Sequence, residues 1–147
     1  MIGRAGREQG RGVGYLQTHQ PEHPVLKALI ACDREAFYET EIESRERTGY
    51  PPFGRLASLI ISGGERPATE GFARRLAALA PRHDQITVLG PAEAPLAVIK
   101  GRFRFRLLVK AARTADLSGY LRQWMAAAPK ATGSLKLEID VDPQSFL

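Results

Sequence analysis

The sequence is poor in residues and segments that would define several common protein classes. It has a single cysteine, Cys32, in 147 residues, which excludes an internal disulfide framework. No apolar run approaches the roughly 18 residues of a membrane-spanning helix. The first residues lack the apolar core of a signal peptide. We therefore expect a cytoplasmic chain with no membrane contact.

Several elements of catalytic and cofactor chemistry are missing too. The sequence has no GxxxxGK[ST] phosphate loop and no DExH segment for Mg²⁺. Its lack of asparagine argues against an acylphosphatase-type site, which would want an Arg and an Asn converging on a phosphate. The spacing of His19, His23 and Cys32 fits no strong metal pattern. We expect no enzyme activity, metal or cofactor in this chain alone.

Positive charge is present and unevenly distributed. Residues 1–50 hold seven Lys and Arg against eight Asp and Glu, whereas residues 51–147 hold fourteen against eight. The basicity therefore belongs to the second part of the chain, where we look for a surface that binds a polyanion. A merely soluble basic surface is the alternative at this point.

Apolar spacing and turn residues predict an α+β fold in two domains, 1–50 and 51–147. In the first, we expect a short strand over 15–18 and two helices, one from Pro24 and one capped by Asp33. In the second, the element order β-α-β-β-α-β predicts a ferredoxin-like domain, with both helices on one face of an open antiparallel sheet. The strands are expected at 56–61, 86–89, 102–110 and 135–141, and the helices at 67–80 and 115–128. Pro91 and Pro95 are expected to break the second strand.

The strand over 102–110 carries the sharpest signal. Side chains alternate across a strand, so its Phe, Leu and Val residues at odd positions share one face. The other face carries cations, and burying them unpaired would cost several kcal/mol each. We therefore expect the rings to pack inward and the cations to face outward and bind a nucleic acid backbone. The candidate DNA-binding residues are Lys100, Arg102, Arg104, Arg106 and Lys110.

Two other interpretations of this strand remain open. Its charges could protect a sheet edge against aggregation, although the third strand of this topology is normally central. An RNA-recognition motif has the same element order, and its third strand also opens with Lys/Arg-Gly, as Lys100-Gly101 does. The aromatic residues of that motif, however, face outward to stack on bases. Phe103 and Phe105 lie at positions of the opposite parity, so we expect them to face the core.

Several segments in the same order resemble one family. They are GRAGR (residues 3–7), QPEHPV, RERTGYPPFGRLA, VLGPAEAP, KGRFRFRLLVK and IDVDPQSF. Together they are similar to the C-terminal portion of the primosomal protein N′ (PriA) family, over essentially all 147 residues. Members of that family are bacterial 3′-to-5′ DNA helicases that restart stalled replication forks.

The resemblance implies roles for particular residues and partners. Arg7 would be the arginine finger of helicase motif VI and Arg4 its companion, both only within a longer parent. Residues 1–50 would end the second helicase lobe, and residues 51–147 would bind forked or duplex DNA. ATP with Mg²⁺, and zinc, would belong to an upstream part of the parent. Other partners would be primosome proteins and the acidic tail of single-stranded-DNA-binding protein, for which Arg113 is our candidate contact. A protein-interaction module is therefore a third possible function.

Overall fold

The computed structural model describes residues 14–144. Its element order is α1 (Pro24–Ile30), α2 (Arg34–Thr48), β1 (Gly54–Gly63), α3 (Arg66–Ala78), β2 (Ile86–Ile99), β3 (Arg102–Ala112), α4 (Leu117–Ala127) and β4 (Lys136–Val141). From β1 onward, this is the predicted β-α-β-β-α-β succession.

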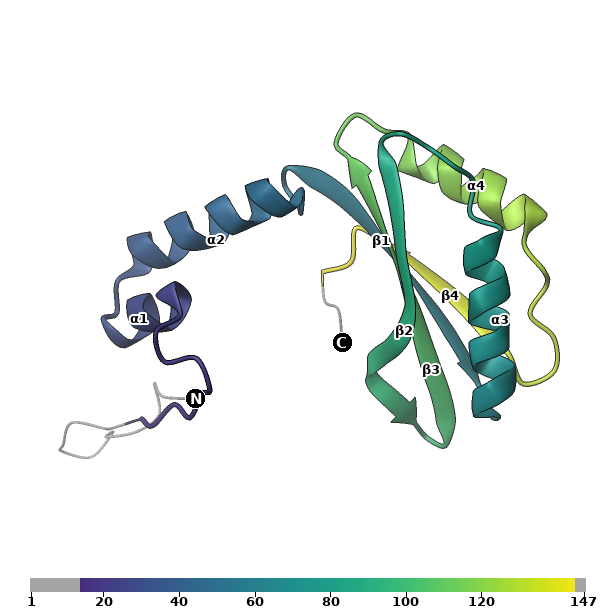
Figure 1. The fold of residues 1–147 in the computed structure, drawn as a ribbon, viewed down its shortest axis with the longest axis horizontal. Coiled ribbons are helices and arrows are strands. Elements are labelled where there is room, and N and C mark those ends of the chain that lie inside the picture. The colour runs from purple at the N-terminus through teal and green to yellow at the C-terminus, as the bar shows by residue number, and fades with distance from the viewer. Residues whose placement is uncertain (1–13, 145–147) are drawn as a thin grey trace. The chain divides into compact units, whose positions relative to one another are not determined.

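The four strands form one antiparallel sheet in the order β2-β3-β1-β4. The helices α3 and α4 lie on the same face of this sheet (Figure 1). The strand β3 pairs with β1 on one side and β2 on the other, so it is central, and the edge-protection interpretation does not fit it. We refer to the sheet face turned away from α3 and α4 as the outer face.

The hydrophobic core fills the space between the sheet and the two helices. Trp124 of α4 is fully buried, and its indole Nε1–H donates a hydrogen bond to the Leu76 carbonyl of α3 at 3.0 Å. Tyr120 packs edge-to-face against Trp124 and donates to the Pro81 carbonyl at 2.9 Å. These bonds satisfy the polar atoms of two large aromatic side chains while their rings bury apolar area.

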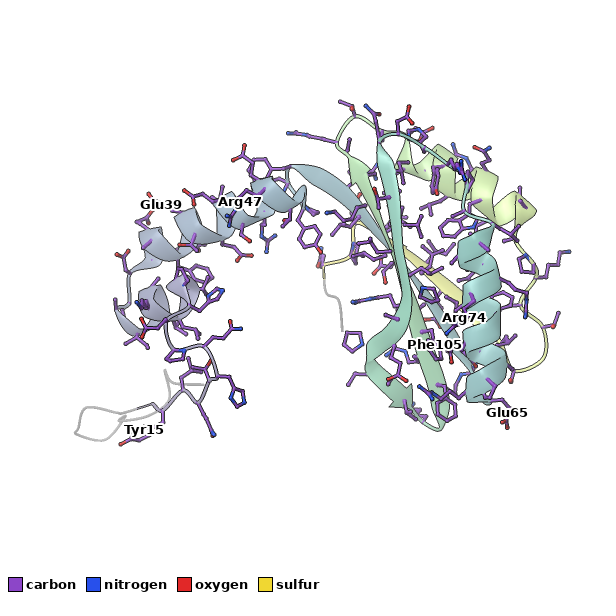
Figure 2. All side chains as sticks on the ribbon, in the orientation of Figure 1. Tyr15, Glu39, Arg47, Glu65, Arg74 and Phe105 are labelled. Atoms are coloured by element: carbon purple, nitrogen blue, oxygen red, sulfur yellow. The ribbon has the colours of Figure 1, made fainter. Side chains whose placement is uncertain are left out.

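The predicted direction of the β3 side chains is confirmed. Phe105 is 5% exposed and belongs to the core, together with Leu107, Val109 and Ala111 of the same strand. Figure 2 labels Phe105 on the ribbon, where it packs within the core. Because side chains alternate along a strand, the residues at even positions face the other way.

The prediction that prolines break the second strand is wrong. The strand β2 continues from Ile86 to Ile99 through both Pro91 and Pro95. It lies at the sheet edge, where one side of the backbone needs no partner, so a missing N–H is tolerated. Register shifts between Leu89 and Ala92 and between Glu93 and Val98 accommodate the irregular stretch.

The N-terminal part is helical, but the strand predicted over 15–18 is wrong. Those residues have no regular secondary structure, and Tyr15 is 95% exposed. A short segment becomes a strand only when it finds a pairing partner and an apolar surface to cover. The two helices are confirmed, and the Asp33 side chain accepts a hydrogen bond from the Ala36 N–H at 3.0 Å, as an N-cap does.

The chain divides into two compact units between Ile42 and Glu43, within α2. The predicted boundary after residue 50 lies later, just beyond the end of α2. The sheet, α3, α4 and the last residues of α2 all belong to the second unit. Among residues 14–144, no helix combines the length and apolar character that a membrane crossing requires.

Candidate nucleic-acid interface

The outer face carries the cations of β3 in register with polar and apolar residues of β1. Arg104 lies opposite Ser62, Arg106 opposite Ile60, and Lys110 opposite Leu56. The rise of about 3.3 Å per strand residue separates successive outward side chains by nearly 7 Å along β3. The arginines therefore form a spaced row in the middle of the sheet.

Part of this row surrounds a hollow at the β2–β3 end of the sheet. The hollow has a volume of about 450 Å³. It is lined by Ser62, Ile99, Lys100, Arg102, Arg104, Lys136 and Glu138. Four cations and one carboxylate thus line the hollow, which has an excess of positive charge. Lys136 was not among the residues predicted for this site, although the alternation of charged and apolar residues over 136–141 could have indicated its outward direction.

The contacts of Arg102 and Arg104 go to uncharged oxygen atoms. Arg102 donates to the Ser62 carbonyl at 3.1 Å, to the Ser62 hydroxyl at 3.2 Å, and to the Ser134 carbonyl. Arg104 donates to the Leu96 carbonyl at 3.3 Å. These bonds fix the directions of the two guanidinium groups without neutralising their charge. A fixed guanidinium that keeps its charge is suited to binding a phosphate.

Lys110 is separated from the arginines by Leu108 and has a different environment. Its Nζ donates a hydrogen bond to the Thr48 carbonyl at 2.6 Å and lies 5.1 Å from the centre of the Tyr50 ring. Thr48 is the last residue of α2, so the ammonium group satisfies a carbonyl at the negative end of a helix. The structure therefore gives Lys110 a structural contact that the strand pattern did not predict.

The outer face is not uniformly basic. The β4 residues on this side are Lys136, Glu138 and Asp140, which pair with Ser62, Ile60 and Ser58 of β1. Arg106 makes a polar or charged interaction of its own. The positive charge is thus concentrated along β3 and around the hairpin end, with Lys136 of β4 beside it, and the outward carboxylates Glu138 and Asp140 lie on β4.

Lys100 and Gly101 form the turn that joins β2 to β3. Both have positive φ, 49° and 74°, as the central residues of a type I′ hairpin turn do. Glycine adopts this conformation without steric cost. The Lys-Gly pair, which also opens the third strand of an RNA-recognition motif, therefore has a local explanation in the hairpin. Lys100 is exposed at its tip.

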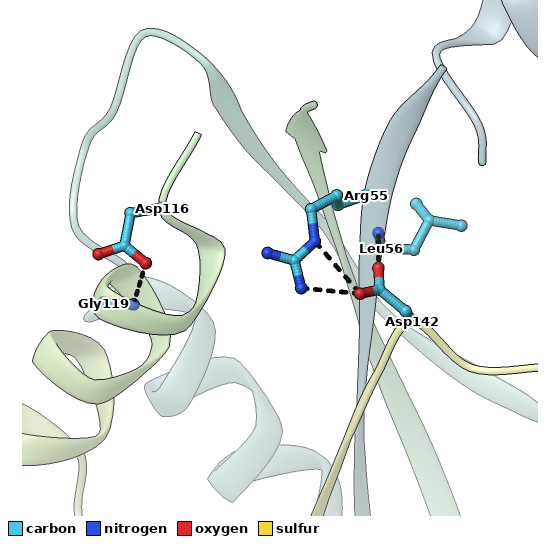
Figure 3. Close-up of polar contacts among 5 residues, drawn as sticks. All are labelled: Arg55, Leu56, Asp116, Gly119 and Asp142. Carbon is cyan, nitrogen blue, oxygen red and sulfur yellow. Dashed lines mark hydrogen bonds and ion pairs between the residues drawn. The ribbon is translucent and has the colours of Figure 1, made fainter. Parts of the chain in front are cut away.

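A pair of charged residues that sequence reasoning missed joins β1 to the end of β4. The Asp142 carboxylate accepts hydrogen bonds from Arg55 Nη2 at 2.7 Å and Arg55 Nε at 3.2 Å, and from the Leu56 N–H at 3.3 Å (Figure 3). The Arg55 guanidinium holds the pKa of Asp142 below its usual value, and Asp142 raises that of Arg55. The two residues are 87 positions apart, so no local pattern indicated the contact.

The remaining predicted residues are outside this site. Arg4 and Arg7 lie outside the described residues. Arg113 is exposed in the loop between β3 and α4. His23 caps α1 by accepting a hydrogen bond from the Val25 N–H at 3.3 Å. Within residues 14–144, no three His, Cys, Asp or Glu side chains form a group that could hold a metal ion.

The fold and the site define an α+β module whose antiparallel sheet is covered by helices on one face and carries a cluster of cations on the other. The chain belongs to a known protein family. Residues 46–144 match the family model described as the primosomal protein N C-terminal domain.

Full-length relatives agree with this assignment. The chain is 35% identical to the replication restart protein PriA of Rickettsia felis over 144 residues, 98% of this chain and 22% of the relative. It is 33% identical over 149 residues to PriA of Haemophilus influenzae and 27% identical over 149 residues to PriA of Bacillus subtilis. These alignments cover 99% and 100% of this chain, and 20% and 18% of the two relatives. The chain therefore spans about a fifth of the length of these curated relatives.

Proposed function

We propose that the outer face of the sheet binds the sugar-phosphate backbone of DNA. The observation that carries this proposal is the hollow where Lys100, Arg102, Arg104 and Lys136 come together beside one carboxylate, Glu138. Like charges held close together repel each other, and a polyanion relieves that repulsion. Such contacts give affinity that depends little on base sequence and strongly on salt.

The family assignment supports DNA as the polyanion. The relatives are replication restart proteins by name, and the module is their C-terminal domain. We infer that the module binds forked or duplex DNA. An ATP-dependent helicase motor would lie elsewhere in the longer parent protein and would move while the module stays bound. ATP with Mg²⁺, and zinc, would be bound by that other part, and this module would not be catalytic alone. The strand order and the two helices on one face support a ferredoxin-like classification of the domain.

Salt-dependent binding tests the proposal with charge-matched variants. We expect the double substitution Arg104→Gln with Arg106→Gln to weaken binding to duplex and forked DNA. We also expect it to reduce the slope of log K against log salt by roughly 0.9 for each phosphate that the variant no longer binds. Fluorescence anisotropy of labelled DNA at several salt concentrations measures both quantities. Arg102 is left intact because it makes three hydrogen bonds within the sheet, to Ser62 and Ser134, whereas Arg104 makes one longer bond, to Leu96.

The control removes the same charge from the other side of the molecule. Arg74 of α3 and Arg122 of α4 are exposed on the helices that cover the opposite face (Figure 2 labels Arg74). Arg74→Gln with Arg122→Gln should lower affinity only slightly, through net charge. Equal losses in the two double variants would contradict a specific role for the outer face.

The alternatives predict different results. For an RNA-recognition motif, aromatic residues must be available on the outer face for base stacking, and Phe105 is buried in the core instead. A module that binds the acidic tail of single-stranded-DNA-binding protein would show tight peptide binding and negligible DNA affinity. In that case Arg113→Glu should weaken peptide binding.

A further inference from the structure

The end of the β2–β3 hairpin has exposed aliphatic side chains. Val98 is 53% exposed, Leu96 50% and Ile99 37%. All three are large and apolar, and they lie within four residues of one another beside the hairpin turn. A cluster of this kind at a projecting end indicates a contact surface more than scattered apolar residues would.

These side chains point to both sides of the hairpin. Val98 pairs with Phe103, whose side chain has the same parity as the core residue Phe105. Ile99 pairs with Arg102 and lines the hollow on the outer face. Directly paired residues of an antiparallel ladder project to the same side, so Val98 and Ile99 project to opposite sides. The hairpin end is therefore apolar on two faces.

The hairpin end is held in place by polar contacts. Between the Glu93–Phe105 and Val98–Phe103 pairs, β2 has extra residues relative to β3, and Leu96 lies in this bulge. The Leu96 carbonyl accepts a hydrogen bond from Arg104, and Glu93 forms an ion pair with Arg66 of α3. Leu96 thus stays exposed on an anchored backbone. A fixed apolar surface loses less conformational freedom when it binds.

Cations lie directly beside this apolar end. Lys100 is at the turn, and Arg102 and Arg104 line the hollow that also includes Ile99. This combination suits a partner that carries closely spaced negative charges next to an apolar surface. Nucleic acid does so, because phosphates flank the faces of its stacked bases. An exposed base step offers two flat surfaces, which match the two apolar faces of the hairpin.

We propose that the hairpin end, formed by Leu96, Val98 and Ile99, acts as an apolar wedge that packs against a base pair exposed at a duplex end or junction. Arg102, Arg104 and Lys100 hold the adjoining phosphates. This inference rests on the proposed DNA-binding function and specifies which DNA feature the module contacts. Insertion of aliphatic side chains at a base step unstacks it and displaces the neighbouring bases.

Fluorescence of 2-aminopurine tests the wedge separately from DNA affinity. The full chain is added to two forked DNAs, one with 2-aminopurine at the junction base pair and one with it in the duplex interior. We expect emission to rise on binding only at the junction, because unstacking relieves quenching. The variant Leu96→Ser with Val98→Thr should lose this rise while keeping its affinity for uninterrupted duplex. Leu79→Ser, which alters an exposed leucine at the end of α3, is the matched control and should behave as the original chain does.

The outcomes separate the wedge from the DNA-binding proposal. If the chain binds DNA but never changes junction emission, or if the double variant keeps the full rise, the wedge is wrong and backbone binding stands. If the chain binds no DNA at low salt, both proposals fail. If the double variant instead loses binding of an acidic peptide and leaves junction emission unchanged, the hairpin end is a protein-docking surface and the wedge is wrong.

Discussion

Asp142, the residue that follows β4, contacts β1 through both its backbone and its side chain. It has a positive φ of 53°, and its N–H donates to the Leu56 carbonyl at 2.8 Å. Its carboxylate accepts bonds from Arg55 and from the Leu56 N–H, so both ends of the residue attach to β1 (Figure 3). Aspartate and asparagine tolerate a left-handed backbone better than most residues, which suits this position. In addition to this backbone preference, the negative charge of the Asp142 carboxylate forms an ion pair with Arg55.

The lowered pKa of Asp142 predicts how stability changes with pH. Arg55 is the largest cause of the lowering, and the Leu56 N–H adds to it. An acid whose pKa is lower in the folded state stabilises the fold above its unfolded value, and that contribution is lost as pH falls through the folded pKa. Asp142→Asn keeps the backbone preference and removes the charge. We expect it to destabilise the chain at pH 7 by about 1 kcal/mol or less, because both side chains are partly exposed.

Urea unfolding at pH 7 and at pH 3 measures this contribution. The difference between the original chain and Asp142→Asn should shrink at the lower pH, because below the ordinary pKa of an aspartate the unfolded chain takes up a proton that the folded carboxylate resists. Asp140→Asn, two residues earlier on the exposed side of β4, is the control. A difference that is the same at both pH values would show that charge at Asp142 contributes nothing.

At the scale of elements, the sequence predicted the features that depend only on residues close together in the chain. The alternation of apolar and charged residues in β3 predicted which face of the strand is buried. Burying the charged face in place of the aromatic face would carry a large cost in free energy. The extent of β2 was missed, because prolines indicate a break unless the strand is known to lie at an edge, and edge position is a property of the whole sheet. The anchored bulge at Leu96 depends on Arg104 of the partner strand, so the β2 segment alone could not indicate it.

Lys110, within the candidate site, also has a contact that the local sequence could not predict. The β3 pattern placed it in one row with the arginines, but its bond to Thr48 joins positions 62 residues apart. The sequence of β3 therefore predicted the direction of the Lys110 side chain but not its partner. Lys100 and Lys110 consequently differ in role, although both are lysines of the same predicted surface.

Replacing each lysine by methionine should separate these roles. Lys110→Met retains an unbranched stem near Tyr50 but loses the donor to the Thr48 carbonyl. We expect a loss of about 0.5–1 kcal/mol in the free energy of unfolding, typical of a cation at a helix C-terminus. Lys100→Met, at the exposed hairpin turn, should leave stability nearly unchanged and weaken DNA binding more than Lys110→Met does.

Chemical denaturation and DNA anisotropy on both variants provide the measurements. Each lysine serves as the control for the other, since both substitutions remove one charge from the outer face. If Lys110→Met lowers DNA affinity as much as Lys100→Met and leaves stability unchanged, Lys110 is a phosphate contact and its cap of α2 is energetically unimportant.

At the scale of the whole molecule, the proposed functional surface lies within one compact unit. The core, the hollow and the hairpin end all fall within residues 43–147. The family model, over residues 46–144, covers nearly the same segment. Family membership, the order of elements and the basic strand could all be inferred from sequence. The division inside α2 could not, because one continuous helical pattern spans both units.

This division predicts that a shortened chain beginning at Glu43 keeps both its fold and its DNA affinity. It retains the core cluster and every candidate cation from Lys100 to Lys136, and it retains Thr48 as the partner of Lys110. We expect the same salt slope as for the full chain and affinity for duplex within about threefold, a difference of less than 1 kcal/mol. Circular dichroism during thermal unfolding checks the fold, and anisotropy at several salt concentrations checks binding. A folded shortened chain with a much smaller salt slope would place the main phosphate contacts in residues 1–42, among them Arg4 and Arg7, and the outer face would then be a secondary site.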